Sequence, residues 1–135
     1  MVTDFPARKP KQHILTMDTL ETLKASLREF VAERDWEQFH SPKNLSMALT
    51  VEAAELLEQF QWLTEAQSRS LTDERRAAVE QEIADIQIYL VRLADTLDVD
   101  IGRAVATKME LNAQKYPVEM ARGNAQKYTD FEDGG

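Results

Sequence analysis

Four carboxylates at matched spacing are the residues in this sequence most suited to chemistry. Glu52 and Glu55 form a Glu-x-x-Glu pair, and Glu82 and Asp85 form a Glu-x-x-Asp pair further along the chain. Residues three apart on a helix project side by side, so each pair can hold one ligand. Oxygen ligands of this kind suit a hard divalent cation such as Mg²⁺. The spacing therefore predicts a metal centre.

The surroundings of the two pairs strengthen this interpretation. Glu52 falls within an apolar stripe of its predicted helix and Glu55 lies at the edge of that stripe, which comprises Leu45, Leu49, Leu56, Phe60 and Leu63. Glu82 and Asp85 share a face with Ala78, Ile86, Tyr89 and Leu93. Neither stripe supplies a lysine or arginine near the acids. A buried carboxylate is costly unless a basic side chain or a metal ion neutralises its charge. A single Glu-x-x-Glu is usually a solvated helix face, but two pairs on apolar faces favour a metal.

Four helices must position these pairs. Their predicted spans are 18–34, 42–62, 72–97 and 100–116, because apolar residues recur there at helical spacing. Residues that commonly cap helices stand at the four starts, namely Asp18, Ser41, Thr72 and Asp100. Residues 63–72 are predicted to form a loop, and the chain after Pro117 is predicted to be extended. We expect a flexible N-terminal arm over 1–17, one all-α domain over 18–130 and a disordered tail over 131–135.

Composition excludes several classes of function. The chain has 135 residues, with 24 acidic against 16 basic, so a basic surface for nucleic acid is not expected. It has no cysteine, which removes disulfide scaffolds and thiolate metal sites. No run approaches the length of a membrane span, and the N-terminus lacks the apolar core of a signal peptide. We expect a soluble cytoplasmic protein with no membrane partner.

Four stretches closely resemble a known family: "ERDWEQFHSPKNL", "VEAAELLEQFQW", "EIADIQIYLVRLAD" and "KMELNAQKYPVEMARGNAQKYTD". They are similar to the all-α nucleoside triphosphate pyrophosphatases of the MazG-like superfamily, and look most like its dCTP pyrophosphatase group. The resemblance covers about residues 19–130. It implies a four-helix protomer that assembles into a homotetramer. The third predicted helix agrees, because it is apolar on nearly every side and needs several partners.

The resemblance also implies roles for particular residues. The four acids Glu52, Glu55, Glu82 and Asp85 match its metal ligands. Three residues match its contacts to the phosphates and their metals, namely Tyr89, Lys108 and Asn112. Three match the aromatic region around its base, namely Trp36, His40 and Trp62. In close relatives within this family a histidine lines the base pocket at the position of Leu27 in this chain. This difference bears on the preference for cytosine and not on the chemistry of hydrolysis.

We therefore expect a Mg²⁺-dependent hydrolase that converts dCTP, or a modified dCTP, to the monophosphate and pyrophosphate and so cleans the nucleotide pool. Glu52 or Glu55 would orient the attacking water or take its proton. One alternative keeps the fold and changes the substrate to dUTP, a damaged purine triphosphate or a broad set. Another is a non-catalytic acidic helical binding module. A di-iron bundle would need two Glu-x-x-His motifs, and only Glu37 and His40 form one.

Overall fold

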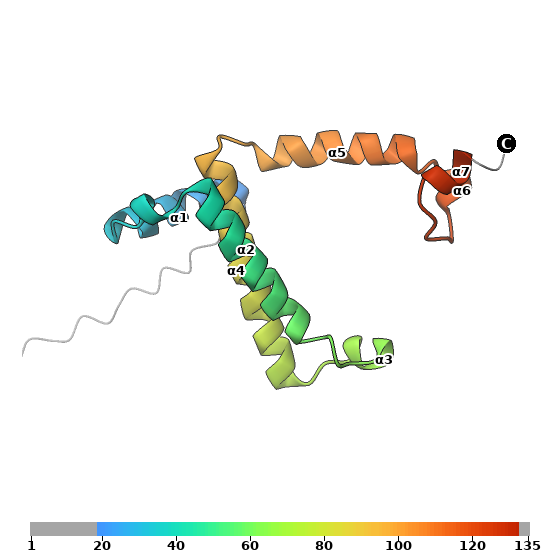
Figure 1. Cartoon of the computed structure of the whole chain (residues 1–135), viewed down its shortest axis with the longest axis horizontal. Coiled ribbons are helices and arrows are strands. Elements are labelled where there is room, and N and C mark those ends of the chain that lie inside the picture. The colour runs from blue at the N-terminus through green and yellow to red at the C-terminus, as the bar shows by residue number, and fades with distance from the viewer. Residues whose placement is uncertain (1–18, 133–135) are drawn as a thin grey trace, which may run out of the picture.

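The computed structural model describes residues 19–132, and within this range every regular element is a helix (Figure 1). The elements are α1 (Leu20–Glu33), the 3₁₀ helix η1 (Glu37–Phe39), α2 (Pro42–Glu58), α3 (Glu65–Ser68), α4 (Asp73–Thr96), α5 (Ile101–Lys115), α6 (Val118–Ala121) and α7 (Thr129–Glu132). The predicted all-α class is confirmed for these residues. The predicted arm over 1–17 and the end of the predicted tail, 133–135, lie outside the described residues.

Side-chain caps start the long helices largely where the sequence predicts. Ser41 accepts a hydrogen bond from the Asn44 backbone N–H at 3.1 Å at the start of α2. Thr72 and Asp100 cap α4 and α5 in the same way. The start of α1 differs by one residue, since Thr19 rather than Asp18 is the cap. These bonds satisfy backbone donors that have no partner inside the helix.

One predicted helix end is wrong, and so is the predicted structure of two segments. Helix α2 ends at Glu58 rather than Trp62, because the Arg75 guanidinium of α4 donates to the Gln59 carbonyl and fixes the chain reversal there. The predicted loop over 63–72 contains the short helix α3, whose cap Thr64 exchanges hydrogen bonds with Gln67. The segment predicted to be extended after Pro117 contains α6 and α7.

The core of the described chain lies between α1, α2 and α4. Helices α2 and α4 run side by side in opposite directions, and α1 packs against the later part of α4. The buried apolar side chains are Leu27, Val31, Leu45, Val79, Val91 and Ala94. This small core fixes the α2–α4 pair, which carries both predicted acid pairs.

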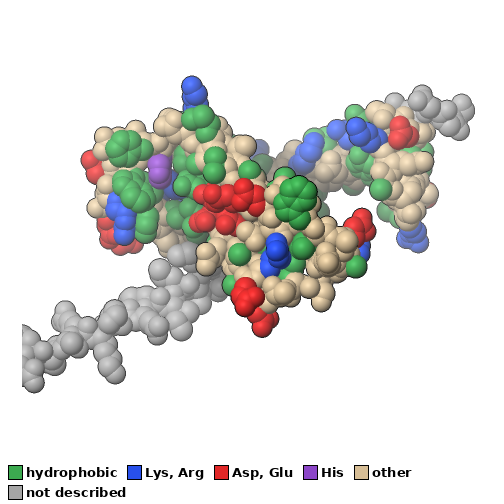
Figure 2. All heavy atoms as spheres, turned by 60° about the horizontal axis from the view of Figure 1, so that its bottom comes forward, with side chains coloured by type: hydrophobic (Ala, Val, Ile, Leu, Met, Phe, Trp, Pro, Cys, Tyr) green, Lys and Arg blue, Asp and Glu red, His purple; other side chains and the backbone are tan. Residues whose placement is uncertain are grey.

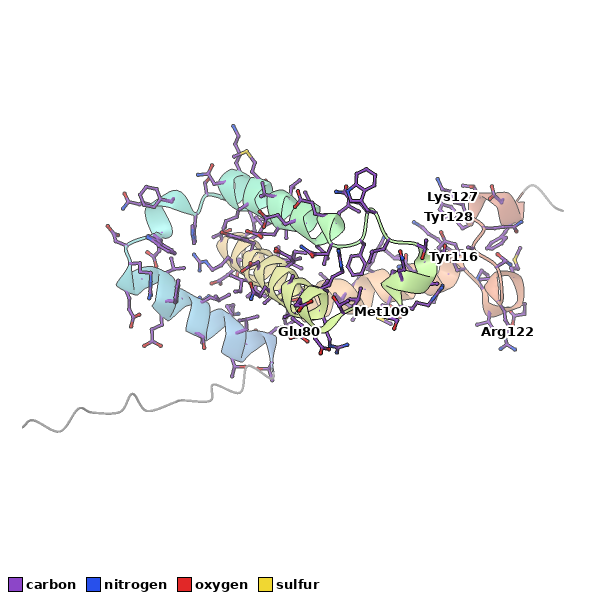
Figure 3. The ribbon with its side chains drawn as sticks, turned by 90° about the horizontal axis from the view of Figure 1, so that it is seen from below. Glu80, Met109, Tyr116, Arg122, Lys127 and Tyr128 are labelled. Carbon is purple, nitrogen blue, oxygen red and sulfur yellow. The ribbon has the colours of Figure 1, made fainter. Side chains whose placement is uncertain are left out.

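Helix α5 leaves this core and extends away from it (Figure 1). None of its own residues is buried, and Val105 and Met109 are largely exposed. At its far end the ring of Tyr116 meets Tyr128 edge-on with centroids 6.0 Å apart, and Lys115 lies 5.0 Å from the Tyr128 ring (Figure 3). Phe131 of α7 also meets the Tyr116 ring edge-on, so aromatic contacts hold α7 at the tip of α5. No helix among residues 19–132 has the length and apolar content needed to cross a bilayer.

Candidate active site

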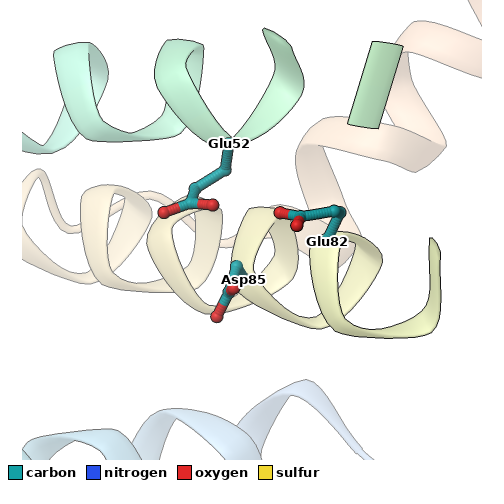
Figure 4. Close-up of side chains that lie close together, drawn as sticks. All are labelled: Glu52, Glu82 and Asp85. Atoms are coloured by element: carbon teal, nitrogen blue, oxygen red, sulfur yellow. The ribbon is translucent and has the colours of Figure 1, made fainter. Parts of the chain in front are cut away.

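The antiparallel packing of α2 and α4 brings three carboxylates together (Figure 4). Glu52 projects from α2 toward Glu82 and Asp85 on α4. One oxygen of each residue lies within 4.8 Å of the corresponding oxygens of the other two. All three side chains are half-buried. Figure 2 shows acidic side chains gathered at the centre of one face of the molecule, among apolar ones.

The three carboxylates are electrostatically unsatisfied as they stand. The Oε2 atoms of Glu52 and Glu82 are buried and have no hydrogen-bond partner. Burial, together with the negative charges of Glu55, Asp85 and Glu82, raises the pKa of Glu52 to about 7. Burial and the neighbouring Glu55 also raise the pKa of Glu82. No described lysine or arginine forms an ion pair with these acids.

This donor set fits a hard divalent cation. Three convergent carboxylates supply only oxygen ligands, which is the chemistry that Mg²⁺ prefers. A bound cation would give the two partnerless oxygens a counter-charge and so relieve the cost of burying them. The geometry and the charge balance thus support a hard divalent cation at these three carboxylates.

The other predicted metal ligand and Tyr89 lie beside this group. Glu55 is exposed and stands outside the three carboxylates, although its charge is close enough to raise the pKa of Glu52 and Glu82. Tyr89 is half-buried on α4, one turn after Asp85. Both residues therefore line the surroundings of the centre, and their roles remain predictions.

The predicted phosphate-binding residues of α5 are not at this centre within one chain. Lys108 and Asn112 are exposed on α5, which extends away from the α2–α4 pair (Figure 1). The sequence places them at helical spacing but says nothing about where α5 points.

The predicted base-binding residues are also dispersed. Trp36 precedes α2 and packs edge-on against Phe30 with ring centroids 5.8 Å apart. Trp62 follows the other end of α2 and is 86% exposed. The 17 residues of α2 separate the two tryptophans by roughly 25 Å along the helix axis. His40 is half-buried, and its Nδ1 atom is buried without a partner.

A charged cluster beside His40 was not predicted from the sequence. Arg28 of α1 donates to Asp95 of α4 through Nε at 2.7 Å and through Nη2 to the other oxygen. Arg92, only 7% exposed, lies 3.5 Å from the same carboxylate. The Arg28 guanidinium holds the pKa of Asp95 below its usual range. The available signal was the "RLAD" stretch, where Arg92 and Asp95 stand three apart in an apolar helix.

The fold and the site together define an all-helical protein with a carboxylate centre for a divalent cation. The protein is all-helical in its described part, and facing carboxylates on two antiparallel helices form a centre suited to a divalent cation. No strand and no glycine-rich phosphate loop takes part in this arrangement of residues 19–132.

Comparison with known proteins identifies the family of this chain. Residues 47–131 match the MazG-like family. The chain is 49% identical to dCTP pyrophosphatase 1 of Rattus norvegicus over 118 residues, which cover 86% of this chain and 69% of that protein. Its identity to dCTP pyrophosphatase 1 of Homo sapiens is 45%, with the same coverage. A crystal structure of a pyrophosphatase from Archaeoglobus fulgidus superposes with a TM-score of 0.69 at 43% identity, over 73% of this chain and 92% of that one. The chain belongs to the MazG-like family.

Proposed function

We propose that this protein hydrolyses dCTP, or a modified dCTP, to the monophosphate and pyrophosphate in a Mg²⁺-dependent reaction that sanitises the cytoplasmic nucleotide pool. The broader activity follows from its relatives: the chain is a nucleoside triphosphate pyrophosphatase. The observation that carries the proposal is the meeting of Glu52, Glu82 and Asp85 with two buried, partnerless oxygens.

The reaction assigns distinct tasks to the carboxylates. Mg²⁺ bound at Glu52, Glu82 and Asp85 would neutralise phosphate charge and acidify a water molecule. Glu55 stands exposed beside this group, so it is free to accept the proton of the attacking water. If the water attacks the α-phosphorus, the bond between that phosphorus and the α,β-bridging oxygen breaks. If it attacks the β-phosphorus, the bond between the β-phosphorus and the same oxygen breaks. Pyrophosphate is the second product in either case.

We also propose that the site is completed by assembly into the homotetramer that the family resemblance implies. Large apolar side chains are exposed on α4 and α5, among them Ile83, Leu97, Val105 and Met109. A second copy of the chain that covers this surface gives α5 the burial it lacks within one chain. In such an assembly Lys108 and Asn112 of one chain serve the phosphates bound at the carboxylates of another.

A substrate panel tests the proposed function. Purified protein with Mg²⁺ should release pyrophosphate from dCTP or 5-methyl-dCTP faster than from dUTP, oxidised purine nucleotides or ribonucleotides. The matched control is Glu80→Gln, an exposed acid on α4 that pairs with Arg76 and lies outside the centre (Figure 3). This variant should behave as the wild type. Absence of pyrophosphate from every nucleotide in the panel would refute the proposal.

A second candidate substrate class is dUTP or a broader set of nucleotides. The observation that favours it is Leu27, which is buried in α1 at the position where the resemblance implies a base-pocket histidine. A leucine offers no hydrogen bond to a base, so it removes one means of separating cytosine from uracil. The same panel decides this alternative, because comparable rates for dCTP and dUTP would favour it.

A further inference from the structure

A charged hollow on the described chain is lined by His40 and by two arginines. It lies between α1, η1 and the later part of α4, and Arg28, Glu37, His40, Arg92 and Asp95 line it. None of the three clustered carboxylates lines it. Glu29 also lines it, but among the described residues Asp95 is the carboxylate that forms ion pairs with both arginines.

Two buried polar atoms of residues that line this hollow have no hydrogen-bond partner among residues 19–132. They are Nε of Arg92 and Nδ1 of His40. The Arg92 side chain is more than nine-tenths buried, and its only ion pair with a described residue is the 3.5 Å contact between Nη1 and Asp95. Arg28 is bound more strongly to Asp95, because two of its nitrogens donate hydrogen bonds to the two carboxylate oxygens. A buried donor without an acceptor is costly and rare, so both atoms are suited to a ligand.

The position of Arg92 fits the far end of a nucleotide. Arg92 lies two helical turns after Asp85 on the same face of α4, roughly 10 Å along the helix axis. A nucleotide whose phosphates sit at the carboxylates extends its sugar and base over a similar length. The base would then reach the hollow that contains His40, a residue to which the family resemblance gives a role near the base.

We propose that Arg92 reads the nucleobase by donating its Nε–H to a carbonyl oxygen of a pyrimidine, while Asp95 and Arg28 hold the guanidinium in place. This inference rests on the proposed function. A guanidinium only donates hydrogen bonds, so its ligand must present an acceptor. The 2-carbonyl oxygen common to cytosine and uracil is such an acceptor. Arg92 thereby selects pyrimidines as a class and does not separate dCTP from dUTP.

The neighbouring His40 complements this donor. Burial and the positive charge of Arg92 lower its pKa, which keeps the imidazole neutral near pH 7. A neutral imidazole offers one donor and one acceptor. The hollow therefore combines a fixed donor at Arg92 with an imidazole that can serve an amino or a carbonyl group of the base.

The test compares two ligands on the full-length chain by calorimetry with Mg²⁺. One ligand is a non-hydrolysable dCTP analogue, and the other is 2-deoxyribose 5-triphosphate, which lacks the base. Arg92→Met should weaken binding of the analogue by about 10- to 100-fold and leave binding of the baseless ligand unchanged. Arg92→Lys should fail to restore affinity, because lysine lacks the planar Nε–H. Arg76→Met, an exposed arginine on the same helix, is the matched control and should alter neither ligand.

Other outcomes overturn the inference. Equal weakening of both ligands would place Arg92 with the phosphates or the assembly, and unchanged binding of both would remove it from the site. If Arg92→Met unfolds, Arg28→Met decides, because it loosens only the clamp on Asp95. It should weaken the analogue a few-fold and spare the baseless ligand, and any other pattern contradicts the inference. A wild-type protein that binds neither ligand would instead refute the proposed function.

Discussion

The α2–α4 pair and the α5–α7 segment are both helical, but they differ in how far their side chains are buried within one chain. In the α2–α4 pair, Leu45 is 1% exposed and three carboxylates converge from facing helices. In the segment beyond Asp100, α5 buries none of its residues and is ordered at its tip by an aromatic cluster. The first region assembles its centre within one chain. The second carries polar residues predicted for the same site, but within one chain α5 extends away from the three carboxylates.

Glu82→Gln should produce the largest effect, because it removes one charge from the centre of the α2–α4 pair. We expect turnover to fall by about 10³-fold or more, since the metal both activates water and neutralises phosphate. Pyrophosphate release at saturating Mg²⁺ measures the loss, and circular dichroism should show unchanged helicity. Retention of wild-type activity would mean that the carboxylate cluster is not the catalytic centre.

Lys108→Met probes the second region and should lower kcat/KM by about 10²-fold through lost phosphate contacts. If α5 serves another chain, mixing this variant with the inactive Glu82→Gln variant after dissociation and reassembly should restore part of the activity. Recovery arises because some hybrid sites combine an intact centre with an intact α5. Mixtures that stay inactive, although they reassemble, would show that each chain uses its own Lys108 or none.

The pH dependence of stability distinguishes the centre from the rest of the chain. The pKa of Glu52 is raised to about 7, so the folded state binds this proton more tightly than the unfolded state. The resulting stabilisation is present at low pH and is lost as pH rises through about 7. With a chelator, the melting temperature should therefore be lower at pH 8 than at pH 6, and Mg²⁺ should reverse the difference. Glu52→Gln should make the melting temperature of the chelated protein less sensitive to this pH change.

Tyr128→Leu should give the smallest effect. It removes the edge-on contact with Tyr116 and the contact with Lys115 at the tip of α5. The expected cost is about 0.5–1.5 kcal/mol, confined to the end of the second region. Hydrogen exchange should show faster opening of α6 and α7 with no change in α2 and α4. A matching loss of protection in α4 would show that the two regions unfold together.

Local signals explain most of what could be predicted about the fold. Ser41, Thr72 and Asp100 cap the helices that they precede, because a cap depends on residues only three positions away. The end of α2 was missed because the Arg75 hydrogen bond that fixes it crosses to another helix. Helices α6 and α7 were missed for a similar reason, since the Tyr116, Tyr128 and Phe131 contacts supply order that their short sequences do not.

The sequence by itself determined that the described chain is helical and that each acid pair lies on one face of its own helix, because spacing along one helix is a local property. It did not decide that Glu52 joins Glu82 and Asp85 while Glu55 stays exposed, since the rotation of α2 against α4 sets that choice. Nor did it indicate that Arg28 clamps Asp95, 67 positions away. These arrangements belong to the tertiary structure because they depend on packing between helices, which the hydrogen bonds within a helix do not specify.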